Sequence, residues 1–463
     1  MSASAPKMED AEEIVSRAIE CARACGAAAA DALLVRSESS EARVRGEEID
    51  FVKQAHERGL GIRVLLREPS RGTPGLSSAV TSTSDLSLET VERMAQETVA
   101  LARATAPDPH AGLPEAGFAS EIPDLRLFDA SDAGASVEAR IDDALRAEAA
   151  ARSVDPRIAN SEGSQVGSDA STTTYGNSEG FLGSYHSASH SLFCEPLARD
   201  ASGMQRDYWM TVGRSLASLE DPAAVGRRAA ERALRRLGGK RVATCEAPVI
   251  FDALTAPSLI GQLVGCASGY AIYREASFLA GRLGEQIASD LVTIVDDGRL
   301  VGGLGSKPFD GEGQPTRRNV LVERGELRSW LLDSYSARKL GLATTGNAAR
   351  GVGSTPSVGT TNLWLEPGDA GTLEDIVADT ERGLLVTELI GMGFNPVTGD
   401  YSRGAAGLWI EAGEIVHPVE EISIAGNLGD MLCAIDRVGS ELAWLGSRAA
   451  PPLRIASMKL AGE

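Results

Sequence analysis

Two short glycine-centred turns in the second half of the chain do most to limit its possible folds. Residues 323–326 (Glu-Arg-Gly-Glu) and 411–414 (Glu-Ala-Gly-Glu) each lie between apolar, strand-like segments. Glycine supplies the positive backbone φ that tight hairpin turns require. The 50 glycines among the 463 residues suit a protein with many such turns. The sequence therefore predicts a β-rich C-terminal domain.

The first half of the chain mixes helical and strand-like segments. Helical character is found in residues 10–25, 86–104, 137–153 and 223–237, and strand character in residues 33–66 and 158–212. No tandem repeat of fixed period is visible, which excludes solenoids and propellers. We expect an α+β fold, with a mixed α/β N-terminal region followed by the β-rich C-terminal domain.

Two breaks suggest how the chain is divided. Residues 106–112, Ala-Pro-Asp-Pro-His-Ala-Gly, interrupt all periodicity, so a linker is expected near 106–114. Gly238 and Gly239 end the last helical segment of the first half. Because 463 residues are too many for one simple core, we expect two domains, 1–240 and 241–463.

Composition limits where the protein works and what it binds. No uninterrupted apolar stretch approaches the roughly 18 residues of a membrane span, and the acidic N-terminal segment lacks the apolar core of a signal peptide. We therefore expect a cytoplasmic protein that does not enter membranes. The net charge of −20 would repel phosphate backbones, so no nucleic-acid partner is expected.

The densest group of basic residues does not change that expectation. Five arginines occur at helical spacing among Ala and Leu: Arg227, Arg228, Arg232, Arg235 and Arg236. Their spacing predicts a solvated helix face and not a binding surface.

The residue types that carry hydrolytic or metal chemistry are sparse. Six cysteines form neither a disulfide framework nor a paired zinc motif. His186 and His190 lie in strand-like sequence, where four residues span roughly 13 Å, too far to share one metal ion. Ser178 lies in a Gly-x-Ser-x-Gly pattern, but no helix follows it as a nucleophile elbow requires.

Several motifs, in a fixed order, carry a resemblance to a known family. Residues 277–285 place Ser-Phe, two glycines and Glu285 in one run, and residues 309–313 read Phe-Asp-Gly-Glu-Gly. Residues 319–327 follow with strand-turn-strand sequence, and residues 421–428 read Glu-Ile-Ser-Ile-Ala-Gly-Asn-Leu. Together they resemble the TldD/PmbA family, and specifically its TldE (PmbA) branch.

The resemblance also shows what this chain lacks. In the TldD branch, the helix upstream of the Ser-Phe run carries a His-Glu-x-x-x-His zinc-peptidase motif. Here residues 259–265 read Leu-Ile-Gly-Gln-Leu-Val-Gly, which offer neither a zinc ligand nor a general base. The resemblance thus implies no catalytic residue and no metal in this chain, with zinc held by a partner subunit.

One loop is a candidate for contact with substrate. Residues 391–402 are glycine-rich, follow an apolar strand and mix aromatic with polar side chains. Rigid scaffolds often present binding residues on such loops, and the resemblance places this segment near a central cavity and a subunit interface. Asn395, Asp400 and Ser402 are the candidate contact residues, although a plain connection between strands explains the sequence equally well.

Three functions remain open at this point. The first is a non-catalytic TldE-type subunit that pairs with a TldD-type zinc peptidase and helps it to degrade or mature short unfolded peptides. The second is a metal-free homodimer that acts as a binding or scaffold protein. The third is a repurposed family member with unrecognised chemistry. A co-purifying partner with the zinc motif would distinguish the first from the other two.

Overall fold

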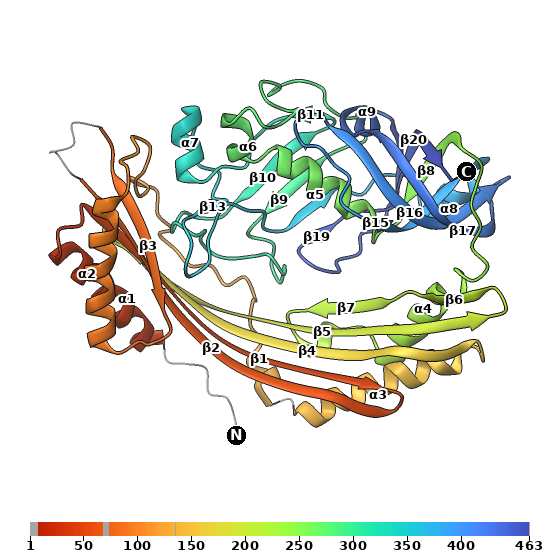
Figure 1. The fold of residues 1–463 in the computed structure, drawn as a ribbon, viewed down its shortest axis with the longest axis horizontal. Coiled ribbons are helices and arrows are strands. Elements are labelled where there is room, and N and C mark those ends of the chain that lie inside the picture. The colour runs from red at the N-terminus through yellow and green to blue at the C-terminus, as the bar shows by residue number, and fades with distance from the viewer. Residues whose placement is uncertain (1–7, 68–73, 135, 463) are drawn as a thin grey trace.

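The computed structural model describes residues 8–67, 74–134 and 136–462. A long curved sheet from the first half of the chain lies opposite a β-rich C-terminal part, and the two meet at both ends of the sheet (Figure 1). Helices cover the outer surface of the curved sheet, and its inner surface faces the C-terminal part (Figure 1).

Among the described residues, the curved sheet consists of seven antiparallel strands. Its strand order is β3-β2-β1-β4-β5-β6, and β7 also pairs with β5. Two long hairpins, β1–β2 and β4–β5, form most of it and are joined through β1 and β4. The bounds are β1 (Ala29–Arg45), β2 (Glu48–Leu66), β3 (Ser77–Thr83), β4 (Ile158–Asn177), β5 (Leu182–Asp200), β6 (Gly203–Arg206) and β7 (Trp209–Gly213).

Two pairs of helices bury their apolar faces against this sheet. The pair α1 (Met8–Ala24) and α2 (Leu88–Ala104) shares one hydrophobic core with β1, β2 and β3. The pair α3 (Val137–Ser153) and α4 (Pro222–Leu234) shares a second core with β4, β5 and β7. All four helices coincide with predicted helical segments, because their apolar residues recur at helical spacing.

The C-terminal part contains three further sheets. The largest has the order β17-β16-β15-β8-β20-β18, the second β11-β10-β9-β14-β19, and the third consists of β12 and β13. The bounds are β8 (Cys245–Phe251), β9 (Ile294–Asp297), β10 (Arg318–Glu323), β11 (Glu326–Leu327), β12 (Ala348–Ala349), β13 (Ser357–Val358), β14 (Leu363–Leu365), β15 (Arg382–Ile390), β16 (Asp400–Glu411), β17 (Glu414–Asn427), β18 (Ile435–Val438), β19 (Arg448–Ala449) and β20 (Leu453–Ala461).

Short helices connect these strands. They are α5 (Ala256–Cys266), α6 (Gly269–Tyr273), α7 (Ser334–Leu340), α8 (Leu373–Ala378) and α9 (Leu428–Cys433), while the 3₁₀ turns η2 (Ala130–Gly134) and η3 (Leu216–Ser218) lie in the first half. The α+β fold with a β-rich C-terminal domain is confirmed. No helix in the described part of the chain is long and apolar enough to cross a membrane.

Both predicted hairpin turns are present. Arg324 and Gly325 connect β10 to β11 with φ values of 47° and 82°, and Ala412 and Gly413 connect β16 to β17 with φ values of 52° and 78°. Positive φ at both central residues is the geometry that matches the twist of paired strands.

The basic face of α4 differs from the prediction. Arg227 and Arg228 are exposed, as expected, but Arg232 is buried and Arg236 is half-buried. Arg232 Nε lies 3.2 Å from Asp207 Oδ1, and Arg236 forms an ion pair with Glu388 on β15. The prediction of a fully solvated face was wrong because these carboxylates lie outside the helix and reach it only after folding. Arg236 joins the two halves of the molecule through Glu388, and Arg232 does so through Asp252, whose Oδ2 lies 3.4 Å from its Nη1.

Candidate functional site

Helix α5 occupies the position where the resemblance places a zinc-binding helix. It starts at Ala256 with a proline in its first turn, where the missing N–H costs no intrahelical bond. Leu259, Ile260 and Leu263 are each 1% exposed and belong to the largest hydrophobic core. The apolar residues therefore fix the helix in place, and Ile260 faces the core and not an accessible site.

The other side of α5 carries no side chain that could hold a metal. Gly265 is exposed and Gly261 is half-buried. A Cβ atom at Gly261 would lie 2.8 Å from Nη1 of Arg448 on β19, whereas a Cβ at Gly265 would meet no atom within 4 Å. The surface of the helix next to Gly261 is thus covered by a guanidinium group.

Zinc does not fit this set of residues. Zinc sites require imidazole, thiolate or carboxylate ligands, and the Arg448 cation beside Gly261 would repel a second positive charge. In the described part of the chain, no cluster of three or more His, Cys, Asp or Glu side chains is arranged to hold a metal.

The Ser-Phe run after α5 has a structural role. Ser277 Oγ donates a 2.8 Å hydrogen bond to the carbonyl of Cys266, the last residue of α5, and accepts one from the N–H of Leu279. The N–H of Phe278 donates to the carbonyl of Pro396 at 2.9 Å. The run therefore ties the end of α5 to the loop formed by residues 391–402.

The three candidate residues of that loop are exposed, but they differ in their contacts. Asn395 Oδ1 accepts from the N–H of Val397 at 3.0 Å, and Asp400 Oδ2 accepts from the Thr398 hydroxyl at 2.7 Å. Ser402 forms a backbone bond to Gly393. The side chains of Asn395 and Asp400 hold the shape of the loop, and contact of all three with substrate stays a prediction.

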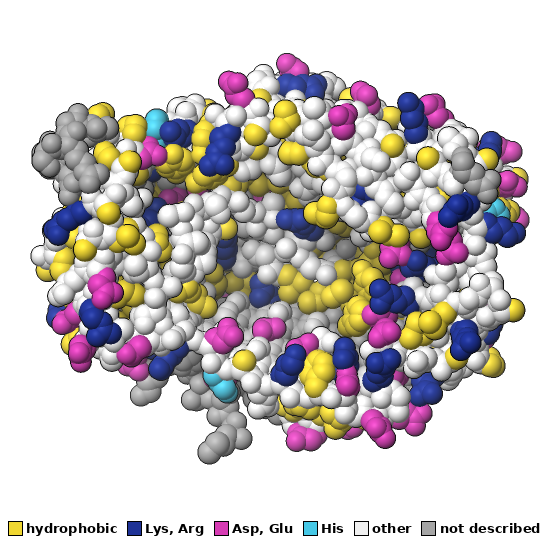
Figure 2. Space-filling view, in the orientation of Figure 1, with side chains coloured by type: hydrophobic (Ala, Val, Ile, Leu, Met, Phe, Trp, Pro, Cys, Tyr) yellow, Lys and Arg dark blue, Asp and Glu magenta, His cyan; other side chains and the backbone are white. Residues whose placement is uncertain are grey.

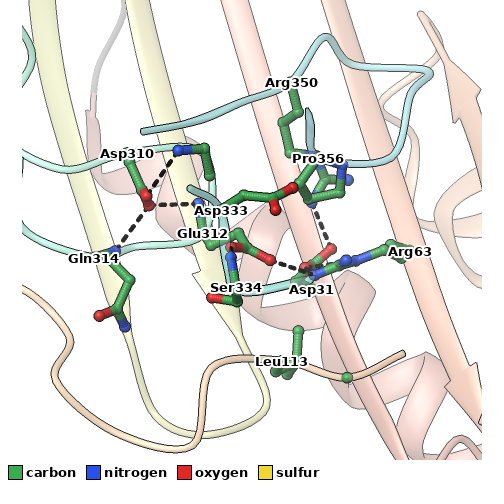
Figure 3. A network of polar contacts seen from close by, with 12 residues as sticks. Asp31, Arg63, Leu113, Asp310, Glu312, Gln314, Asp333, Ser334, Arg350 and Pro356 are labelled. Atoms are coloured by element: carbon green, nitrogen blue, oxygen red, sulfur yellow. Dashed lines mark hydrogen bonds and ion pairs between the residues drawn. The ribbon is translucent and has the colours of Figure 1, made fainter. Parts of the chain in front are cut away.

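The Phe-Asp-Gly-Glu-Gly motif leads to a buried ionic network that the sequence did not reveal (Figure 3). Asp31 on β1 accepts hydrogen bonds from Arg63 Nε on β2 at 2.9 Å and from Arg350 Nη1 at 2.6 Å. Glu312 Oε1 lies 3.9 Å from Arg63 Nη2, and its other oxygen accepts from the N–H of Ser334. The network joins the curved sheet to the C-terminal domain.

Burial and charge act in opposite directions on these groups. Burial raises the pKa of Asp31, but Arg350 and Arg63 outweigh that effect and lower the pKa overall. Burial raises the pKa of Glu312 to about 7, although Arg63 acts to lower it. Asp31 is thus held as a carboxylate, whereas Glu312 titrates near neutral pH.

The other acid of the motif, Asp310, also has a structural role. Asp310 Oδ1 accepts from the N–H groups of Glu312 and Gln314, and its Oδ2 accepts from the N–H of Ala348 at 3.0 Å (Figure 3). Asp310 is 2% exposed and Glu312 is 1% exposed. These carboxylates organise buried loops and are shielded from any ligand in solution.

Between the two parts of the molecule, the surface is hollowed. Figure 2 shows a hollow across this face with hydrophobic and basic side chains within it. Helix α5 and β19 lie on the C-terminal side of the gap, and β5 and β7 on the opposite side (Figure 1). A ligand in this hollow would contact both halves of the chain.

Comparison with known proteins shows which family this chain resembles over its whole length. The metalloprotease PmbA of Escherichia coli O157:H7 is 39% identical over 453 residues, which cover 98% of this chain and 96% of the relative. This chain belongs to the PmbA/TldD family. Its segments 30–102, 131–237 and 244–462 match domain 1, the central domain and the C-terminal domain of the PmbA/TldA metallopeptidases.

Solved structures of family members have the same fold. TldE from Thermococcus kodakarensis superposes with a TM-score of 0.87 at 26% identity, covering 97% of this chain and 100% of that one. A Bacteroides thetaiotaomicron protein described as a putative modulator of DNA gyrase gives a TM-score of 0.90 at 27% identity, covering 98% and 99%. This chain therefore shares the PmbA/TldD fold over nearly its whole length.

Proposed function

We propose that this chain is the non-catalytic, TldE-type subunit of a zinc metallopeptidase that degrades or matures short unfolded peptides. The observation that carries the proposal is the surface of α5. The fold of a metallopeptidase family is complete, yet Ile260, Gly261 and Gly265 offer no ligand and Arg448 lies against Gly261. The zinc, its bound water and the general base would belong to a TldD-type partner.

In this proposal the subunit contributes a wall of the substrate chamber. The hollow between the curved sheet and the C-terminal domain would hold the peptide in an extended form, as an added strand or alongside one. Holding a peptide in attack geometry raises its reaction rate by orders of magnitude without any reacting group on this chain.

Reconstitution tests the proposal. The purified chain is expected to retain no stoichiometric zinc after dialysis against a weak chelator and to leave an unfolded peptide uncleaved. Addition of a TldD-type partner with the His-Glu-x-x-x-His motif is expected to produce chelator-sensitive cleavage. The control is the same mixture with that motif's Glu replaced by Gln in the partner.

The other outcomes have distinct meanings. Zinc-dependent cleavage by the isolated chain would overturn the proposal directly. A stable metal-free homodimer that neither binds nor activates a zinc-bearing partner would favour a scaffold or binding protein instead.

A further inference from the structure

A cavity of about 690 Å³ lies in the hollow between the two halves of the molecule. Four separate segments line it: residues 124–130, residues 212–218 at the end of β7, residues 300–304 and residues 444–446. Its volume is within the range of about 300–1,000 Å³ that ligand sites usually have. None of the candidate residues in the 391–402 loop lines it.

Exposed hydrophobic side chains gather around this cavity. Val301 is 58% exposed and Phe128 is 36% exposed, and both line the cavity. Trp444 also lines it and makes an edge-to-face contact with Trp364, with ring centroids 5.9 Å apart. An apolar wall that is open to solvent and rigidly supported is suited to an apolar group on a ligand.

Parts of the wall are bare backbone. Gly302 and Gly446 line the cavity, and a Cβ at either position would meet no atom within 4 Å. In the described sheet, β7 pairs with β5 and its outer edge has no strand partner. The Gly302 N–H already donates to the Leu125 carbonyl, so the open edge of β7 supplies the N–H and C=O groups for an extended chain. This polar backbone favours a peptide over a purely apolar molecule.

The cavity is also preformed. Arg214, at the end of β7, donates from Nη2 to the carbonyls of Gly303 and Leu304 and from Nη1 to the carbonyl of Ala188. The segment 124–130 is fixed on both sides, because its Leu125 carbonyl accepts from Gly302 and its Leu127 carbonyl accepts from Ala188, each at 2.7 Å. Binding would therefore require little ordering of the wall.

We infer that this cavity is a specificity site that takes a large apolar side chain, such as Phe or Leu, from an extended peptide. The inference rests on the proposed function only for the ligand class, a peptide. Phe128, Val301 and Trp444 enclose the side chain, and the glycine backbone at Gly302 and Gly446 lies beside the peptide main chain. The subunit without catalytic groups thereby selects which part of a substrate is held.

Binding to the isolated full-length chain tests this site without any partner. The probes are two capped, fluorescently labelled decapeptides of Gly, Ser, Thr and Ala that differ at one central position, Phe or Ser. The Phe peptide is expected to bind about 10- to 100-fold more tightly, since burial of a large apolar side chain is worth about 1.5–3 kcal/mol and each tenfold corresponds to about 1.4 kcal/mol.

Two variants locate the binding. Val301→Glu places a charge on the apolar wall and is expected to weaken binding of the Phe peptide at least tenfold. Gly446→Leu fills the open space beside Trp444 and is expected to remove the preference for Phe over Ser. Val416→Glu is the matched control, because Val416 is 48% exposed on β17 and does not line the cavity.

Equal affinity for the two peptides, no measurable binding of either, or equal losses in Val301→Glu and Val416→Glu would each overturn the inference. Its failure is separable from that of the proposed function. Selective binding without cleavage in the reconstituted mixture would refute only the peptidase role, whereas cleavage by the mixture without a preference for Phe would refute only this site.

Discussion

Helix α5 and the Phe-Asp-Gly-Glu-Gly motif each suggest catalysis, the helix by its position in the fold and the motif by its acidic residues. In each region a second observation argues against that role. Helix α5 lies where the family resemblance predicts catalysis, yet its residues are mainly Leu, Ile, Gly and Val, and its core-facing side is sealed. The motif at residues 309–313 has two acids of the kind that catalysis uses, yet both are almost completely buried and hold loops together. A reactive site needs both suitable residue types, which α5 lacks, and accessibility, which the motif lacks.

The largest effect is expected for Arg350→Met, which tests the structural role of the buried ionic network. The side chains of Arg350 and Asp31 are both fully buried, so removal of Arg350 leaves a buried carboxylate that has lost one of its two cations and keeps Arg63 and the Tyr175 hydroxyl. We expect a loss of about 3–5 kcal/mol in the free energy of unfolding, measured by urea denaturation. Arg328→Met is the control, since its pairs with Glu323 and Glu326 are largely exposed and are worth about 1 kcal/mol or less. Similar losses in both variants would show that the buried pair contributes no more to stability than an exposed one.

The interpretation of helix α5 is tested by introducing the His-Glu-x-x-x-His motif with the three substitutions Ile260→His, Gly261→Glu and Gly265→His together. We expect no zinc binding and no cleavage, together with a loss of about 2–4 kcal/mol in stability. The loss arises because an imidazole would replace the Ile260 side chain, which is 1% exposed, and a buried polar ring is costly. The carboxylate introduced at position 261 would meet Arg448. Elemental analysis and urea denaturation measure both effects, and one equivalent of bound zinc would contradict the interpretation.

Features set by local sequence could be predicted, whereas contacts between distant residues could not. Helical spacing and the paired turns were sufficient to predict α1 to α4 and the β10–β11 and β16–β17 hairpins, because those signals are local. The inward-facing Arg232 and the Asp31–Arg350 pair could not be predicted, since their partners are distant in sequence and meet only after folding. The missing ligands on α5 were visible in the sequence, but Arg448 beside Gly261 was not.

Glu312 should make the free energy of unfolding depend on pH. Burial raises its pKa from the ordinary value of 4.5 to about 7, so between these values the folded state binds more protons than the unfolded state. Its contribution to stability is complete below about pH 4.5 and is lost as the pH rises through about 7. Glu312→Gln is expected to flatten this part of the stability profile by at most about 1.4 kcal/mol per pH unit. An unchanged slope from urea denaturation across this range would contradict the assignment.

The smallest effect on stability, and the cleanest test of substrate contact, is expected at Ser402. Changes at Asn395 or Asp400 would disturb the 391–402 loop itself, because both side chains accept hydrogen bonds within it. Ser402 is exposed, and among the described residues its hydroxyl forms no hydrogen bond that holds the loop. Ser402→Ala should therefore change the free energy of unfolding by less than about 0.5 kcal/mol. If the loop contacts substrate, the same variant should raise KM for peptide cleavage in the reconstituted mixture without separating the subunits. An unchanged KM at unchanged stability would assign residues 391–402 to the connection between β15 and β16 alone, and would leave the cavity at Val301 and Trp444 as the peptide-binding surface of this chain.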